Sequence, residues 1–249
     1  MIRSVTHAQT RTWHRTHVER HRRSWYIVAF LIMIALVSTY SGYFDGISWD
    51  ILATAVFHTT FRLILAYIIA LLLGVTIALL VGWSPFIDIL FPVFDIFQNL
   101  PSFALIPFFI YVFGFTDQMI ILFAVSSILW PILFSVLTAI KGAHRDLSDA
   151  ATIFGARGFR FIRYYLAPLS LPAILTGSIV GIAIGWEAVI GAEIIVNIVG
   201  FGSFIKDVSV TGINQVAVAG LLVILLIVFS INRLVWAPLL EQSSRHYAE

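Results

Sequence analysis

The chain has 249 residues, of which 60% are apolar and 11% are charged, with a formal net charge of +2 and a mean hydropathy of +0.97. This composition excludes a soluble domain, and the lack of cysteine excludes disulfides, thiolate metal sites and cysteine nucleophiles. Several windows of about twenty residues carry little or no charge, which is the length needed to cross a hydrocarbon core of about 30 Å. We therefore predict an all-α, polytopic membrane protein.

Residues 1–24 form a basic tail with six arginines and four of the chain's seven histidines. We interpret it as a cytosolic tail held inside by its positive charge. Metal binding by the histidines and contact with anionic lipids are alternatives, although no spacing typical of metal ligands supports the first. The apolar stretch that starts at Trp25 has no convincing small-residue cleavage site, so we expect an uncleaved signal anchor.

Six membrane spans are predicted along the chain. Residues 25–57 hold the first span, at about 25–40, and an external loop. The core at residues 58–240 holds the other five, at about 60–81, 86–115, 119–139, 172–195 and 216–237, and residues 241–249 form a cytosolic C-terminal tail. Prolines 92, 101 and 107 predict that the third consists of a short helix, a kink and a span ending at Gly114, because proline cannot continue a helix.

The charge of the connecting segments predicts the orientation. With the N-terminus inside, the cytosolic segments at residues 1–24 and 141–163 carry six and five basic residues, whereas the external segments carry one, Lys206. Lysine and arginine are enriched on the cytosolic side of membrane proteins. We therefore predict a multi-pass protein of the bacterial inner membrane, with both termini and the loop after the fourth span in the cytosol.

That loop, residues 141–171, is the longest polar interruption between apolar segments. Asp146 or Ser148 is suited to cap a short helix, and Gly155 is suited to end it in a left-handed conformation. Alanines 150 and 151 leave one helix face bare, so that another surface can approach closely. On these grounds alone, a docking helix and an ordinary loop whose charges set the topology are equally supported.

An ordered set of residues resembles the EAA-motif permease subunits of bacterial ABC importers, with Asp149 in place of the first glutamate of the motif. The spacing from Gly155 to Pro168 and Pro172 is similar to that of the nitrate/sulfonate/taurine-type members. The pattern covers about residues 59–206 and also includes Pro101, Pro107, Gly114, Pro131, Gly142, Thr176, Gly177, Trp186, Glu193 and Gly200-Phe201-Gly202. Phe201 stands where the family usually has leucine, and Glu187 is an additional charge that leaves the substrate open.

The resemblance implies the fold of a type I ABC importer permease, with about six transmembrane helices and a cytosolic coupling helix that docks into a separate ATPase. The residues implied in coupling are Asp149, Ala150, Ala151, Gly155, Ala156, Pro168 and Pro172. The sequence contains no G-x-x-x-x-G-K-[ST] phosphate loop, so we expect this chain not to be an enzyme by itself. It would bind no cofactor, and the partner ATPase would use ATP and Mg²⁺.

The resemblance also implies partners on both sides of the lipid bilayer. An ABC ATPase subunit would bind inside, and an extracytoplasmic solute-binding protein would deliver a small polar solute outside, near residues 200–206. We expect a homodimer, because one coupling loop per chain cannot serve two ATPases, and we expect no nucleic-acid contact. Nitrate, taurine, a sulfonate, bicarbonate and a vitamin precursor such as a thiamine pyrimidine all remain candidate substrates.

The fifth span contains a stripe of glycines. Gly177, Gly181 and Gly185 recur every four residues, so that another helix can approach closely. Packing within the chain is the main interpretation of this stripe, and a seam between two chains is the alternative.

The same span contains two carboxyl groups, Glu187 and Glu193. An acid inside the membrane is costly unless it faces water or a partner, so each is a functional candidate. We predict that both border the translocation pathway together with Trp186. For Glu193 an interfacial position is the alternative, and Arg62 is a candidate partner for either acid.

Gln98 and Asn99 stand just before the break at Pro101. Amides beside such a break can line a solute path or can bond to the loosened backbone, and both interpretations stay open. His58 and His144 are isolated, and the sequence suggests no catalytic residues and no metal site. The rival function is a secondary transporter or channel driven by an ion gradient through Glu187 or Glu193.

Overall fold

The computed structural model describes residues 49–99, 101–143, 145–210 and 214–231, together with residues 234, 236, 238 and 239. The predicted basic tail, first span and C-terminal tail lie outside these residues. Every regular element among the described residues is helical, which confirms the predicted all-α class.

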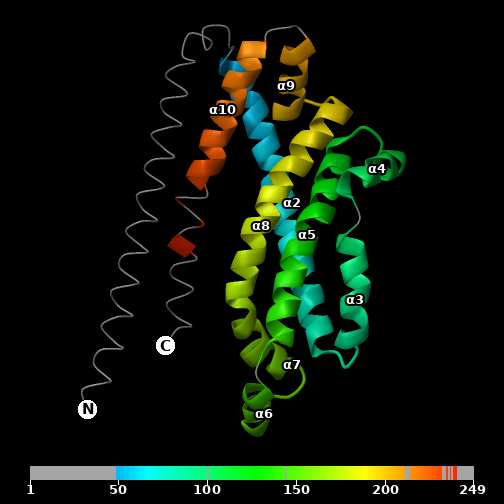
Figure 1. Cartoon of the computed structure of the whole chain (residues 1–249), viewed down its shortest axis with the longest axis vertical. Coiled ribbons are helices and arrows are strands. Elements are labelled where there is room, and N and C mark those ends of the chain that lie inside the picture. Colours follow the sequence, from blue (N-terminus) through cyan, green and yellow to red (C-terminus); the bar gives the residue numbers. More distant parts are fainter. Residues whose placement is uncertain are drawn as a thin grey trace, which may run out of the picture.

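Three long helical segments cross the molecule side by side along its longest axis (Figure 1). They are α2 (Trp49–Trp83), α5 (Asp117–Lys141) and a continuous run, Phe159–Val196, and each is long and apolar enough to span a bilayer. The run consists of α7 (Phe159–Phe161), the π-helical turn η3 (Ile162–Leu166) and α8 (Ala167–Val196).

The proline-rich segment forms the broken element that the sequence predicts. It consists of α3 (Ile87–Gln98), the 3-10 turn η2 (Ser102–Leu105) and α4 (Ile106–Phe113), which together add a fourth candidate crossing. Pro107 occupies the second position of α4, where its missing N–H costs no hydrogen bond. Gly114 ends α4 with a φ of 67°, so this predicted end is correct.

Shorter helices lie at the two ends of the long ones (Figure 1). α6 (Arg145–Ile153) lies at one end, after α5, and α9 (Phe201–Val210) lies at the other, after α8. α10 (Asn214–Ile231) corresponds to the described part of the predicted sixth span, and its apolar part, Ala217–Ile231, is shorter than a full crossing.

Two predicted span boundaries are wrong. α2 begins at Trp49 rather than near Thr60, because no proline or glycine interrupts this stretch and Leu52 and Ala55 pack in the core. The fifth span begins at Phe159 rather than at Pro172. Pro168 is only the second residue of α8, and the helix continues through Pro172 after the π-helical turn.

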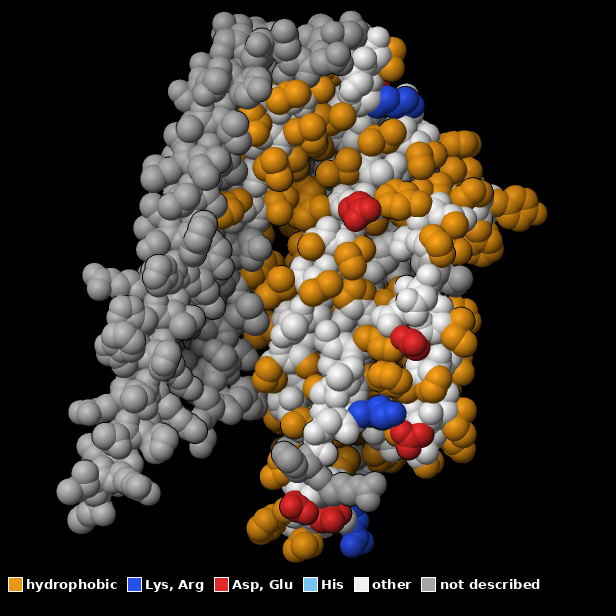
Figure 2. Space-filling model, in the orientation of Figure 1, with side chains coloured by type: hydrophobic (Ala, Val, Ile, Leu, Met, Phe, Trp, Pro, Cys, Tyr) orange, Lys and Arg blue, Asp and Glu red, His pale blue; other side chains and the backbone are white. Residues whose placement is uncertain are grey.

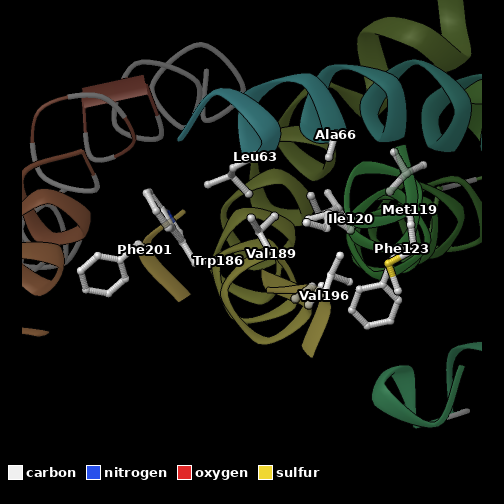
Figure 3. Close-up of a cluster of buried hydrophobic side chains, with 14 of the residues drawn as sticks. Leu63, Ala66, Met119, Ile120, Phe123, Trp186, Val189, Val196 and Phe201 are labelled. Atoms are coloured by element: carbon white, nitrogen blue, oxygen red, sulfur yellow. The ribbon is translucent and has the colours of Figure 1, made fainter. Parts of the chain in front are cut away.

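The larger of two buried apolar clusters among the described residues, here called the core, joins α2, α5, α8 and α9. Figure 3 shows Leu63 and Ala66 of α2, Met119, Ile120 and Phe123 of α5, Val189 and Val196 of α8, and Phe201 of α9 around it. Most of these side chains are fully buried, since α5 lies between the other long helices. The core therefore holds the three long helices together at the end where α9 lies.

The glycine stripe of α8 lies against α5 of the same chain. A Cβ atom added at Gly177 would lie 2.8 Å from both the Cα of Ile132 and the carbonyl oxygen of Pro131. One added at Gly181 would meet Ile128 at 3.0 Å, and one at Gly185 would meet it at 2.7 Å. These glycines let the two helices approach closely, as the packing interpretation predicts.

Charged side chains are sparse on the face shown in Figure 2, where hydrophobic side chains are far more numerous over the described elements. At the end of α5 near α6, Lys141 Nζ lies 2.9 Å from Asp88 Oδ1 and 4.7 Å from the ring centre of Phe91. This contact joins α5 to α3.

Candidate functional site

The helix α6 ends in a glycine-based C-cap. Gly155 has a φ of 85°, and its N–H donates to the carbonyl oxygen of Thr152 at 3.0 Å. The N–H of Ala156 donates to the carbonyl oxygen of Ala151, also at 3.0 Å. These two bonds satisfy carbonyls that the helix end would otherwise leave unpaired. The left-handed stop predicted at Gly155 is confirmed.

The beginning of α6 differs from the prediction. Neither Asp146 nor Ser148 caps the helix, because α6 already begins at Arg145 and both residues lie within it. Asp146 still lies in the first turn, where a negative charge is favourable near the positive end of the helix dipole.

The α6 surface, defined as residues 145–156, exposes large apolar side chains on a short polar helix. Phe154 is 90% exposed, Ile153 is 83% exposed and Leu147 is also exposed. A pocket of about 500 Å³ adjoins it, lined by Ala151, Phe154, Gly155, Ala156, Arg160, Tyr164 and Tyr165. Apolar groups that remain in water at a helix end are typical of a protein interaction site.

The structure places the predicted coupling residues in two groups. Asp149 is exposed, and Ala150, Ala151, Gly155 and Ala156 lie beside it on the α6 surface. The two prolines of the pattern instead lie within the first turns of α8. They shape the long helix next to the α6 surface and are not part of that surface.

A buried ion pair lies toward the other end of the molecule from α6, close to the start of α9. Glu193 of α8 is fully buried, and one of its carboxylate oxygens lies 2.6 Å from Arg62 Nη1 of α2. Arg62 also donates from Nε to Asp117 Oδ1 at 2.7 Å and from Nη1 to the carbonyl oxygen of Val199 at 2.8 Å. One guanidinium thus connects α2 to the start of α5, to the last turns of α8 and to the segment between α8 and α9.

The carboxylate of Glu193 is also bonded to α2 and α9 by neutral groups. The Thr59 hydroxyl lies 2.9 and 2.8 Å from its two oxygens, and the N–H of Gly202 donates to it at 2.9 Å. The same hydroxyl accepts the N–H of Phe201 at 2.8 Å. We call Thr59, Arg62, Asp117, Glu193 and Gly202 the carboxylate cluster.

Close packing around Glu193 explains the glycines of the Gly200-Phe201-Gly202 pattern. A Cβ atom at Gly200 would collide with the carboxylate of Glu193, and one at Gly202 would collide with the carbonyl oxygen of Ile190. Glycine is therefore needed at both positions so that the start of α9 can approach the acid.

The other predicted pathway residues differ in exposure. Trp186 is buried in the core, and Figure 3 shows it near Val189. Glu187 is exposed, and among the described residues no ion pair or hydrogen bond reaches its side chain. Gln98 and Asn99 are exposed. Gln98 donates to the side chain of Asp95 and Asn99 donates to its carbonyl oxygen, so both amides are bonded within their own helical turn.

Sequence reasoning named Arg62 as a candidate partner of Glu193 but missed Thr59 and Asp117. Thr59 could have been found, because it lies three residues before Arg62 and so on nearly the same face of α2. Asp117 had no comparable signal, since it lies 55 positions away from Arg62 in the chain.

Comparison with known proteins is consistent with this arrangement of long apolar helices joined by a polar helix. Residues 70–237 match the family described as binding-protein-dependent transport system inner membrane component. The taurine transport system permease protein TauC of Escherichia coli (strain K12) is 29% identical over 76% of this chain and 67% of its own length. The nitrate import permease protein NrtB of Leptolyngbya laminosa is 25% identical over 78% of this chain and 68% of its own length.

A third relative, the bicarbonate transport system permease protein CmpB of Synechocystis sp. (strain ATCC 27184 / PCC 6803 / Kazusa), is 29% identical over 65% of this chain and 57% of its own length. The helices and the match together define the class as a multi-pass membrane permease. This chain belongs to the family of inner membrane components of binding-protein-dependent transport systems and is a permease component of an ABC importer.

Proposed function

We propose that this chain transmits the energy of ATP hydrolysis from a separate ATPase through the α6 surface. The exposed Phe154 and Ile153 carry this proposal, because apolar side chains on a short polar helix are suited to fill a groove of a partner. The chain contains no phosphate-binding loop, so it needs such a partner, and ATP and Mg²⁺ would be held there.

The proposed assembly has two copies of this chain, two ATPases and an external solute-binding protein. Each copy contributes one α6 surface, so two identical chains would serve two ATPases. The basic residues at 141–163, which flank and include α6, favour a cytosolic position for this end and for both termini. The binding protein would then dock at the opposite end, where α9 lies.

In this proposal the carboxylate cluster and the pathway residues have separate roles. Glu193 and Arg62 hold α9 in place for the binding protein, while Glu187, Gln98 and Asn99 remain exposed and border the path of the solute. The relatives' names mention taurine, nitrate and bicarbonate, and we propose that this chain also passes a small polar solute.

Transport driven by an ion gradient is disfavoured as the rival function. Membership of the ABC importer family argues against it, and Glu193 is already paired with Arg62 and inaccessible to water. ATP depletion should therefore stop uptake, and an uncoupler that leaves the ATP level unchanged should not.

Replacing Gly155 with aspartate should abolish ATPase docking while the chain still inserts into the membrane. A side chain there is strained at the φ of 85°, so the C-cap of α6 and the position of Phe154 would change. Co-purification of the ATPase and its transport-coupled activity measure the effect, and we expect a loss of at least tenfold, or about 1.4 kcal/mol of docking free energy.

Gly114→Asp is the matched control. Gly114 also has a positive φ and open space around it, but it lies at the end of α4, and the whole of α5 separates it from α6 in the sequence. That variant should retain the ATPase. Equal co-purification of the ATPase with the Gly155→Asp chain and the native chain would refute the coupling role of the α6 surface.

A further inference from the structure

Glu187 lies inside a membrane-crossing helix, in the half nearer to α9, 20 residues after Ala167, the first residue of α8. It is nine residues before Val196, the last residue of α8, which corresponds to about 14 Å at 1.5 Å per residue. The hydrocarbon core is about 30 Å thick, so the carboxyl is far from either water layer unless the assembly brings water to it. A carboxylate that faces lipid at this depth would be strongly unfavourable.

The face of α8 that carries Glu187 differs from the lipid-type face of α2. On α2 the exposed side chains are large and apolar, among them Phe57, Phe61, Ile68 and Leu72. On α8, Ala183 and Val180 are exposed one and two turns before Glu187, so they share its face. Val180 and Ile194, seven residues to either side of Glu187, are apolar and exposed, but the carboxyl itself is suited to border water and not acyl chains.

The charges around this face are unbalanced toward the negative. Among the described cations, Lys141, Arg145, Arg157, Arg160 and Arg163 lie between the end of α5 and η3, Arg62 belongs to the carboxylate cluster, and Lys206 lies on α9. Arg62 already contacts two carboxylates, those of Glu193 and Asp117. Among the described residues, the charge of Glu187 is therefore without a compensating cation.

We infer that the face of α8 around Glu187 borders an aqueous passage whose potential favours solutes with a positively charged group over simple anions. This inference rests on the proposed function, in which α8 lines the path of the solute. A carboxylate in a narrow, poorly solvated passage attracts cations and repels anions over several ångströms. The solute would then be an amine or another organic cation, a different class from nitrate and bicarbonate.

The absence of cysteine from the chain allows a direct test with charged thiol reagents. Ala183→Cys is introduced alone and with Glu187→Gln, and the complex with the ATPase is purified in lipid nanodiscs. The rates of modification by a trimethylammonium-ethyl and by a sulfonato-ethyl methanethiosulfonate are then measured and normalised to a free thiol. We expect both reagents to react, with a cation-to-anion ratio that Glu187→Gln lowers about threefold to tenfold.

Leu72→Cys is the control for a lipid-facing position. Leu72 is 64% exposed on α2, two residues before Gly74, which packs against the same Ile132 as Gly181 does, so its depth is similar to that of Ala183. It should react with neither reagent. If Ala183→Cys disturbs assembly, Val180→Cys replaces it, since Val180 is also exposed on this face.

Two results would overturn the inference. If the cysteine on α8 were as unreactive as Leu72→Cys, the face would be sealed by lipid or by a second chain. If Glu187→Gln left the ratio unchanged, the carboxyl would set no potential there. Failure of the native chain to co-purify with the ATPase would instead refute the proposed function, so the two failures are distinguishable.

Discussion

Replacing Glu193 with alanine should lower the free energy of unfolding by about 3–5 kcal/mol, because it leaves the guanidinium of Arg62 buried without its closest partner. Asp117 would still contact Arg62, but its side chain is 60% exposed and is screened by water. Gly202 and Thr59 would also lose a buried acceptor. We expect the thermal midpoint in detergent, followed by tryptophan fluorescence, to fall by roughly 10 °C.

Glu187→Ala is the matched control, since it removes the same side chain from the same helix at an exposed position. It should leave the midpoint nearly unchanged. The double variant Arg62→Met/Glu193→Leu removes both buried charges and should recover part of the loss. Equal midpoints for Glu193→Ala and Glu187→Ala would show that the carboxylate cluster does not stabilise the fold.

Gly177→Val should separate α8 from α5 and destabilise the chain by about 1–3 kcal/mol or more. A Cβ atom there would lie 2.8 Å from backbone atoms of Ile132 and Pro131, and backbone cannot move aside as the end of a flexible side chain can. The effect would extend to the carboxylate cluster, because α8 carries Glu193. Thermal unfolding and the yield of monodisperse protein in detergent measure it.

Thr176→Val is the control, because it places the same side chain at the neighbouring exposed position. It removes only the hydroxyl bond to the carbonyl oxygen of Pro172. We expect it to behave like the native chain. If Gly177→Val were equally stable, the close contact between α5 and α8 would have to relax without cost, and the glycine stripe would have no packing role.

The position of α6 and its end at Gly155 could be predicted because the signals are local. A polar segment between apolar spans, a bare alanine face and a glycine at the stop act within one or two turns. The start of α6 and the boundaries of α2 and α8 were predicted wrongly. There the helix continues past weak local signals such as Pro168, because the flanking residues pack against other helices.

The carboxylate cluster could be predicted only in part. Residue type alone made Glu187 and Glu193 equal candidates, although six residues place them roughly 120° apart around a helix. Packing decides which of the two faces α2 and which faces outward, and so which acid finds Arg62. Of the partners from other helices, Thr59 shares a face of α2 with Arg62 and could have been found, whereas Asp117 carries no mark of this role in the sequence.

By itself, the sequence determined the membrane class, the broken third span and a polar segment that stops at Gly155, because hydrophobicity and turn chemistry are properties of short segments. The tertiary structure decided that the glycine stripe lies against α5 of the same chain and that Glu193 is neutralised by a residue 131 positions away. These depend on which helix faces meet in space, and each such contact is a property of two segments and not of one.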